Sequence, residues 1–179
     1  MKLYRIAMLV IICTIMAFGS VCMAAMGPRV AVLPTLNKNP IKSSMDSQFD
    51  ESIATGYVTD AFGNPKLGYE LVERAELMAA LEEQKLSNSA LFDPSTAAQF
   101  GRLLGAQYVV INNVTSISRT GDKIVVRMMA RAINSETGQV YISGTGMGQG
   151  ADLIGAIEAA ADDVVEGKKG IIARKEGRR

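Results

Sequence analysis

The chain has 179 residues, 48% of them hydrophobic and 6% aromatic, with 19 basic and 18 acidic residues, two cysteines and no histidine. Without histidine, nucleophilic sites of the Ser-His and Cys-His kind are excluded, as are zinc sites built on imidazole. A charge balance near zero gives no general attraction to nucleic acid, so we expect no nucleic-acid partner.

The first residues have the pattern of an export signal. Lys2 and Arg5 precede an apolar run over 6–18, interrupted only by Thr14, and mainly small residues follow up to Ala25. A charged region, an apolar region and a small-residue cleavage site in this order predict a signal peptide over 1–24, cleaved near Ala24.

Two alternatives to this cleavage are weaker. An uncleaved membrane anchor needs about 20 apolar residues, more than this run supplies. Lipid attachment through Cys22 is disfavoured because Val21, which is not a small residue, precedes it. Cleavage would remove Cys13 and Cys22, leaving the exported chain with no thiol, disulfide or thiolate metal site.

The next part of the chain predicts a strand, a loop and a helix. Residues 29–34 (RVAVLP) form a continuous apolar run that ends in proline, as expected of a strand covered on both faces. Residues 37–44 are polar, contain a proline and predict a loop. A helix follows, which Gly63-Asn64-Pro65 ends, because apolar residues recur every four positions: Phe49, Ile53, Tyr57 and Ala61.

Residues 69–110 predict strand, helix, turn, helix and strand. A short apolar strand over 69–72 is followed by a helix over 75–86, with Leu77 and Leu81 at helical spacing. Asp93 before Pro94 predicts the start of a second helix, because Asp caps free amides and Pro is tolerated at the first helical position. Gly105 ends that helix in the left-handed conformation, and a buried strand follows.

Three β-rich runs then predict an antiparallel meander: 108–118, 124–133 and 139–147. The two gaps between them are short and contain glycine, as in hairpins. In the middle run, alternate residues from Ile124 to Ala132 form a core face. The other face is mixed, as on a surface that meets another chain, and its residues Arg127, Met129, Arg131 and Ile133 are the candidate interface.

Residues 146–151 (GMGQGA) imitate a dinucleotide-binding fingerprint. The context argues against a cofactor, because no second parallel strand follows the next helix. The glycines alternate strictly, which indicates a strand with a bare face against which the small residues of the final helix pack closely. We expect no catalytic, cofactor-binding or metal-binding residues.

The chain ends in a helix and a basic tail. The helix over 152–165 places Ile154, Ile157, Ala161 and Val164 on one apolar stripe. Residues 168–179 carry six basic residues and one acid. This tail is either a solvated terminus or a weak contact with an anionic membrane surface.

Five segments, in this order, carry a family resemblance: 29–34 (RVAVLP), 71–74 (LVER) with Leu77 and Leu81, 83–84 (EQ), 101–106 (GRLLGA) running into 108–110 (YVV), and 137–138 (TG). They resemble the curli production assembly/transport family, whose CsgG-type domain is related to the TolB amino-terminal and LpoB-like envelope domains. The resemblance implies a periplasmic domain over 25–167, between the signal peptide and the tail at 168–179. The curli channel also has two long pore hairpins per subunit, but their positions here hold only Ser118–Lys123 and Gly146–Gly150.

The predicted fold is an α/β (α+β) sandwich, a mixed sheet of about five strands with a parallel first part and an antiparallel three-strand meander, packed by about four helices. The resemblance implies a non-enzymatic periplasmic envelope protein, an oligomeric or accessory component of a curli-type secretion or assembly system without the pore hairpins. Its partners would be itself or an envelope complex, through the candidate interface or the helix over 75–86. The alternative is an LpoB-like docking regulator of a peptidoglycan synthase.

Overall fold

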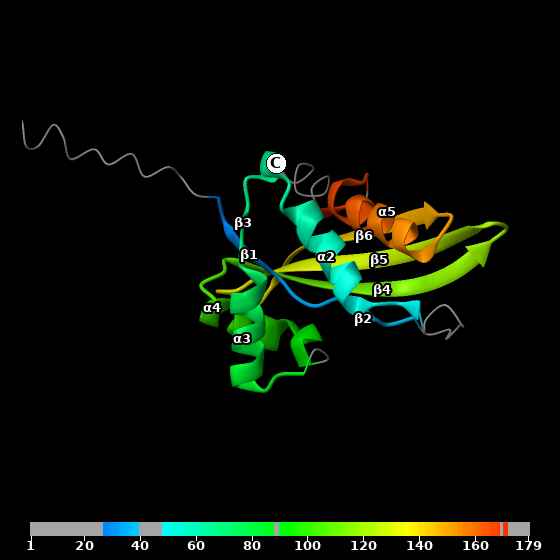
Figure 1. Cartoon of the computed structure of the whole chain (residues 1–179). Coiled ribbons are helices and arrows are strands. Elements are labelled where there is room, and N and C mark those ends of the chain that lie inside the picture. The colour runs from blue at the N-terminus through cyan, green and yellow to red at the C-terminus, as the bar shows by residue number, and fades with distance from the viewer. Residues whose placement is uncertain (1–26, 40–47, 88–89, 169, 172–179) are drawn as a thin grey trace, which may run out of the picture.

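The computed structural model describes residues 27–39, 48–87, 90–168 and 170–171 (Figure 1). The predicted signal peptide, Cys22 and most of the predicted basic tail lie outside the described residues. In chain order, the elements are β1 (Arg29–Val32), β2 (Leu36–Asn37), α2 (Glu51–Phe62), β3 (Glu70–Leu71), α3 (Arg74–Gln84), α4 (Pro94–Leu103), β4 (Tyr108–Thr120), β5 (Lys123–Asn134), β6 (Val140–Gly150) and α5 (Leu153–Glu166), with short 3-10 helices at Pro65–Leu67 and Ala90–Phe92.

The six described strands form one mixed sheet in the order β3-β1-β4-β5-β6, with β2 pairing to β4. β1 pairs in parallel with β3 and β4, and β4, β5 and β6 form the antiparallel meander. The two meander turns contain Gly121 and Gly138 at φ values of 60° and 71°, where a side chain would be strained. The predicted α+β architecture is therefore confirmed, with β2 as an additional short strand.

Helices cover both faces of the sheet and create two apolar cores (Figure 1). α2 and α5 cover one face, and the first core includes Val58, Val114, Met128 and Ile157. α3 and α4 pack on the other face, and the second core includes Leu33, Leu77, Phe100 and Ile133. β1 lies between the cores and sends alternate side chains into each, which explains why residues 29–34 are apolar without interruption.

The glycines of β6 allow α5 to approach the sheet closely. A Cβ atom on Gly146 would lie 2.2 Å from the Val164 nitrogen and 2.6 Å from the Ala160 oxygen, both backbone atoms of α5. Gly148 meets the backbone of Ala156 and Ala160 in the same way. The predicted packing of a bare strand face against the final helix is confirmed, and helix backbone occupies the space beside the fingerprint-like glycines.

The start and end of α4 follow the sequence signals. The Asp93 carboxylate accepts a hydrogen bond of 2.9 Å from the Thr96 backbone nitrogen, and Pro94 is the first helical residue. Gly105, directly after the cap residue Leu104, has φ 61°. Both signals act within a few residues, so they are readable without knowledge of the tertiary packing.

Two helices turn different faces to the core from those predicted. α2 buries Ala54, Val58 and Phe62, whereas Ile53 is 38% exposed. In α5, Ile154 is 50% exposed, although the rest of its predicted stripe is buried. An apolar residue at helical spacing is buried only where the neighbouring layer covers it, and neither Ile53 nor Ile154 lies under the sheet.

Two further expectations are corrected at the ends of elements. Part of the predicted loop over 37–44 is already strand, since Leu36–Asn37 pairs with β4 and the Lys38 nitrogen donates to the Val114 oxygen at 2.9 Å. The core also continues beyond residue 167, because the Ile171 side chain is 2% exposed within the first core. The packed domain therefore includes residue 171.

Candidate functional site

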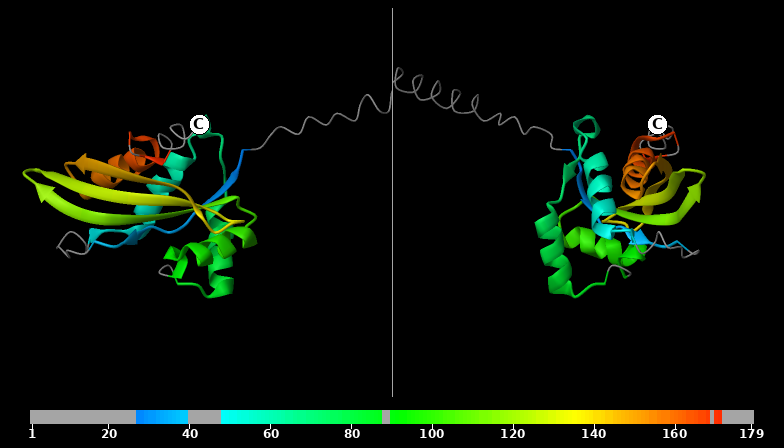
Figure 2. Two further views of the ribbon diagram at one scale, coloured as in Figure 1. Left: turned by 180° about the vertical axis from the view of Figure 1, so that it is seen from behind. Right: turned by 45° about the vertical axis from the view of Figure 1, so that its right-hand side comes forward.

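The open face of the meander is the first candidate site. α3 and α4 cover only the end of the second sheet face at which β4 begins and β5 ends, and none of the described helices lies on the rest of that face (Figure 2, left). There, Met129 lies between Asn113 of β4 and Thr145 of β6, and Arg127 lies between Ser116 and Met147. We call Arg127, Met129, Arg131, Thr145 and Met147 the open face.

Three of the four residues predicted for an interface lie on this open face. Met129 is 37% exposed, Arg127 is exposed and Arg131 is partly exposed. The Arg127 guanidinium contacts the Ser116 hydroxyl at 3.5 Å, a weak interaction that leaves its charge facing solvent.

Ile133 does not belong with them. Its side chain is 0% exposed and packs in the second core with Phe100 and Val109. α4 covers the sheet at this point, because Gly101 allows the helix to come so close that a Cβ there would lie 2.3 Å from the Val109 side chain. The same strand face is thus buried at one end and open at the other, so Ile133 cannot contact a partner directly.

Met147 and Thr145 were missed by the sequence analysis. Met147 is 45% exposed, and both residues point away from α5, since the adjacent Gly146 and Gly148 face that helix. The strict alternation of glycines already contained this signal, because residues between core-facing positions of a strand must project from its opposite face.

The open face is basic. Among the described residues, neither Arg127 nor Arg131 forms an ion pair, and the open face includes no acidic residue. Met129 between the two arginines and Met147 opposite Arg127 offer a flexible apolar contact with positive charges beside it, a composition suited to binding an acidic protein surface.

The second interface predicted from sequence, the helix over 75–86, corresponds to α3. Leu77 and Leu81 are buried as expected, whereas Met78 is 48% exposed. A shallow groove runs along its outer side between Ala75 and Ser87. α3 therefore presents a second surface, on which Glu82 and Lys85 lie beside apolar residues.

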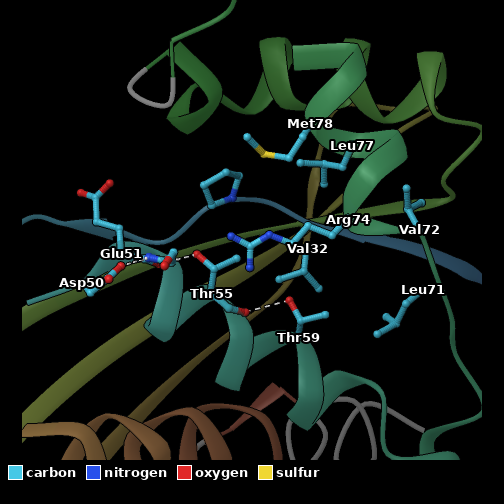
Figure 3. A pocket seen from close by; sticks show the side chains of 12 residues that line it. Val32, Asp50, Glu51, Thr55, Thr59, Leu71, Val72, Arg74, Leu77 and Met78 are labelled. Atoms are coloured by element: carbon cyan, nitrogen blue, oxygen red, sulfur yellow. Dashed lines mark hydrogen bonds between the residues drawn. The ribbon is translucent and has the colours of Figure 1, made fainter. Parts of the chain in front are cut away.

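A pocket of about 340 Å³ lies at the carboxyl ends of the parallel strands β1 and β3, between α2 and α3 (Figure 3). Val32, Leu71, Val72 and Leu77 supply apolar walls, and Arg74 extends across the pocket towards the start of α2. In open α/β sheets, ligands commonly bind in this position, where connections leave on opposite faces.

The polar groups of this pocket are largely engaged in holding α2. The Thr55 and Thr59 hydroxyls donate to the Glu51 and Thr55 carbonyl oxygens at 2.6 and 2.7 Å. The pKa of Asp50 is lowered, first by a hydrogen bond from the Ser52 side chain and then by the backbone N–H of Ser52. These hydroxyls are not activated as nucleophiles, and Asp50 acts as a helix cap.

The described residues also bear on metal binding and membrane insertion. No three acidic, cysteine or histidine side chains in the described ranges gather where they could hold a metal ion. None of the helices in that part of the chain combines the length and apolar character that crossing a membrane requires.

A comparison with known protein families shows to which family this chain belongs. The model of the curli production assembly/transport component CsgG matches residues 28–164. The chain belongs to the CsgG family. The match extends from the residue before β1 almost to the end of α5, so it includes every described strand, and the family predicted from the five segments is confirmed.

This CsgG-family chain is similar to several solved structures. E. coli LpoB, solved by NMR, is 21% identical with a TM-score of 0.55, over 70% of this chain and 58% of LpoB. The hypothetical protein CT253 from Chlamydia trachomatis is 13% identical with a TM-score of 0.50, over 84% of this chain and 96% of that protein. Lipoprotein GNA1162 from Neisseria meningitidis is 19% identical with a TM-score of 0.49, over 66% and 78% respectively.

These similarities concern the fold alone. No curated protein matches the sequence significantly. Membership of the CsgG family places the chain among the accessory and transport components of the cell envelope.

Proposed function

We propose that this CsgG-family chain is a non-enzymatic, periplasmic component of an envelope secretion or assembly system. It acts by binding protein chains, its own copies included, through the open face. The observation that carries the proposal is a sheet surface that none of the described helices covers, on which Met129 and Met147 are 37% and 45% exposed beside two arginines.

The surrounding chemistry supports binding over catalysis. The chain has no histidine, and the Thr55 and Thr59 hydroxyls of the pocket donate to backbone carbonyls. Thioether side chains adapt their shape to a partner, and arginine is enriched at the centres of protein interfaces. Family membership supports the envelope location, and the predicted signal peptide supports export to the periplasm.

The test is the mass of the exported protein, expressed as the full chain and measured by light scattering after size-exclusion chromatography. We expect a defined oligomer for the wild type. Met129→Lys should weaken the oligomer at least about tenfold, because a third cation would be buried between Arg127 and Arg131. Leu103→Lys is the matched control, since Leu103 is 55% exposed on α4, outside the open face.

Other outcomes distinguish the alternatives. An oligomer that Met129→Lys leaves intact contradicts the open face as the interface. If the wild type is a monomer that binds a peptidoglycan synthase, and Met129→Lys does not bind it, the protein is an LpoB-like docking regulator. The shared fold favours this alternative. Substrate turnover by the purified chain contradicts a non-enzymatic role.

A further inference from the structure

We infer that the partner of the open face is a second copy of this chain, which binds through the outer surface of its α2 and α5. The inference rests on the proposed function, because it names what the open face binds. We call this outer surface the acidic hollow and define it as Ile53, Tyr57, Asp60 and Ile154, with Glu158 one helical turn after Ile154. It belongs to the layer on the sheet face opposite the open face (Figure 2).

The apolar part of the acidic hollow is the first step. A shallow depression of about 430 Å³ lies between α2 and α5, and Ile53 and Ile154, which line it, are 38% and 50% exposed. Exposed apolar side chains that gather beside charged residues are typical of protein-binding sites. On the open face, Met129 and Met147 are the exposed apolar groups, and their thioether side chains can adapt to the shape of such a depression.

Charge is the second step. Neither α2 nor α5 contains lysine or arginine, and Asp60, Glu158 and Asp162 are exposed on them. None of these three carboxylates forms an ion pair within the described part of the chain. The open face has the opposite composition, with two arginines and no acid. The two surfaces are therefore complementary in charge, which selects the partner and its orientation at an interface.

α3 carries the other exposed acids of the helices, but it matches the open face less well. Its acids lie beside bases, since Glu76 accepts a hydrogen bond of 2.7 Å from the Arg29 guanidinium, and Glu82 and Lys85 line the same groove. These bases already offset part of the negative charge of α3. The acidic hollow, whose two helices contain no base, is the stronger counterpart for two arginines.

The positions of the two surfaces determine the kind of assembly. Because they lie on opposite faces of one sheet, the open face of one copy meets the acidic hollow of the next in a head-to-tail contact. Copies joined in this way form a ring or an open chain rather than a twofold dimer. A twofold contact between two open faces would instead bring the arginines of both copies together without a counter-charge, which is unfavourable.

Two charge-reversed variants of the full exported protein test this contact: Arg127→Glu/Arg131→Glu on the open face and Asp60→Lys/Glu158→Lys on the acidic hollow. None of the four side chains is buried, so both variants should fold, and their urea midpoints check this. Each variant alone should self-associate at least about tenfold more weakly than the wild type, because like charges meet at the contact.

An equimolar mixture of the two variants should restore the oligomer. The glutamates of one variant then meet the lysines of the other, and the two unchanged surfaces pair as in the wild type. Light scattering after size-exclusion chromatography measures all three samples. Raising the salt from about 0.05 to about 0.3 M should weaken the wild-type oligomer, since salt screens exposed charges.

Glu82→Lys/Glu83→Lys is the matched control, because it makes the same change of charge at exposed positions of α3 and should leave the oligomer intact. If Met129→Lys weakens the oligomer and Asp60→Lys/Glu158→Lys does not, the inference is overturned while the proposed function stands. A mixture that stays as weakly associated as its components overturns it too, as does a control that loses the oligomer equally. A monomeric wild type also overturns it, although a different protein could then still bind the open face as proposed.

Discussion

Single glycines decide how closely the layers of this domain approach each other. At Gly146 the backbone of α5 occupies the space that a side chain would need, since backbone atoms of Val164 and Ala160 lie within 2.6 Å of where a Cβ would be. Gly56, in the middle of α2, has nothing within 4 Å of the corresponding position. The same residue type is therefore required at one position and dispensable at the other.

Gly146→Val should destabilise the fold by about 3 kcal/mol, because backbone atoms cannot move aside as a flexible side chain can. Gly56→Ala should instead stabilise it by about 0.5–1 kcal/mol, since alanine loses less backbone entropy in a helix. Urea unfolding of the two variants measures both changes. A Gly146→Val midpoint equal to that of the wild type would contradict the packing of α5 on β6.

At the scale of elements, a buried polar network joins β1, β4 and α2. Asn112 of β4 is 0% exposed and donates from its side-chain nitrogen to the Leu33 oxygen at 2.9 Å. Its amide oxygen accepts from the Thr35 hydroxyl, and the Thr35 nitrogen donates to the Thr55 hydroxyl of α2 at 2.8 Å. The network supplies hydrogen-bond partners for the backbone of Leu33 and Thr35, where the chain leaves β1.

Asn112→Ala should cost about 2 kcal/mol, because it leaves the Leu33 oxygen and the Thr35 hydroxyl buried with fewer hydrogen bonds. The neighbouring Asn113 points to the opposite, partly exposed face, so Asn113→Ala should change stability by less than about 0.5 kcal/mol. Thermal and urea unfolding of the pair provide the test. Equal losses in both variants would show that the network is not what stabilises this connection.

For the whole molecule, the first core requires a residue beyond the last helix. Ile171 is buried among side chains from the first core, although it follows α5 by five positions. The backbone of Ile171 also lies close to Gly144 of β6. The segment after α5 thus closes one end of the core, and the domain is larger than the helix pattern indicates.

Ile171→Ala should destabilise the domain by about 2–4 kcal/mol, the cost of emptying a buried isoleucine site. A chain that stops after Ile171 should keep wild-type stability, because it retains the buried side chain. Differential scanning calorimetry distinguishes the two variants. If the shortened chain loses as much stability as Ile171→Ala, residues after 171 also stabilise the fold. Burial of Ile171 would then not explain where the domain ends.

Much of this architecture follows from the sequence by itself. The α4 cap at Asp93, the left-handed Gly105, the meander turns and the glycine face of β6 all depend on local chemistry within a few residues. Local conformation and strand alternation do not require knowledge of the rest of the chain, so these elements were predictable.

Only the tertiary structure decided which faces are covered. β5 continues with the same alternation from Arg127 to Ile133, yet α4 buries Ile133 and leaves Met129 exposed. α2 turns Val58 rather than Ile53 to the sheet, and Ile171 is drawn into the core. The physical reason is that burial depends on where another layer lies. A periodic pattern distinguishes the two faces of an element, but it does not show how far the neighbouring layer extends over them.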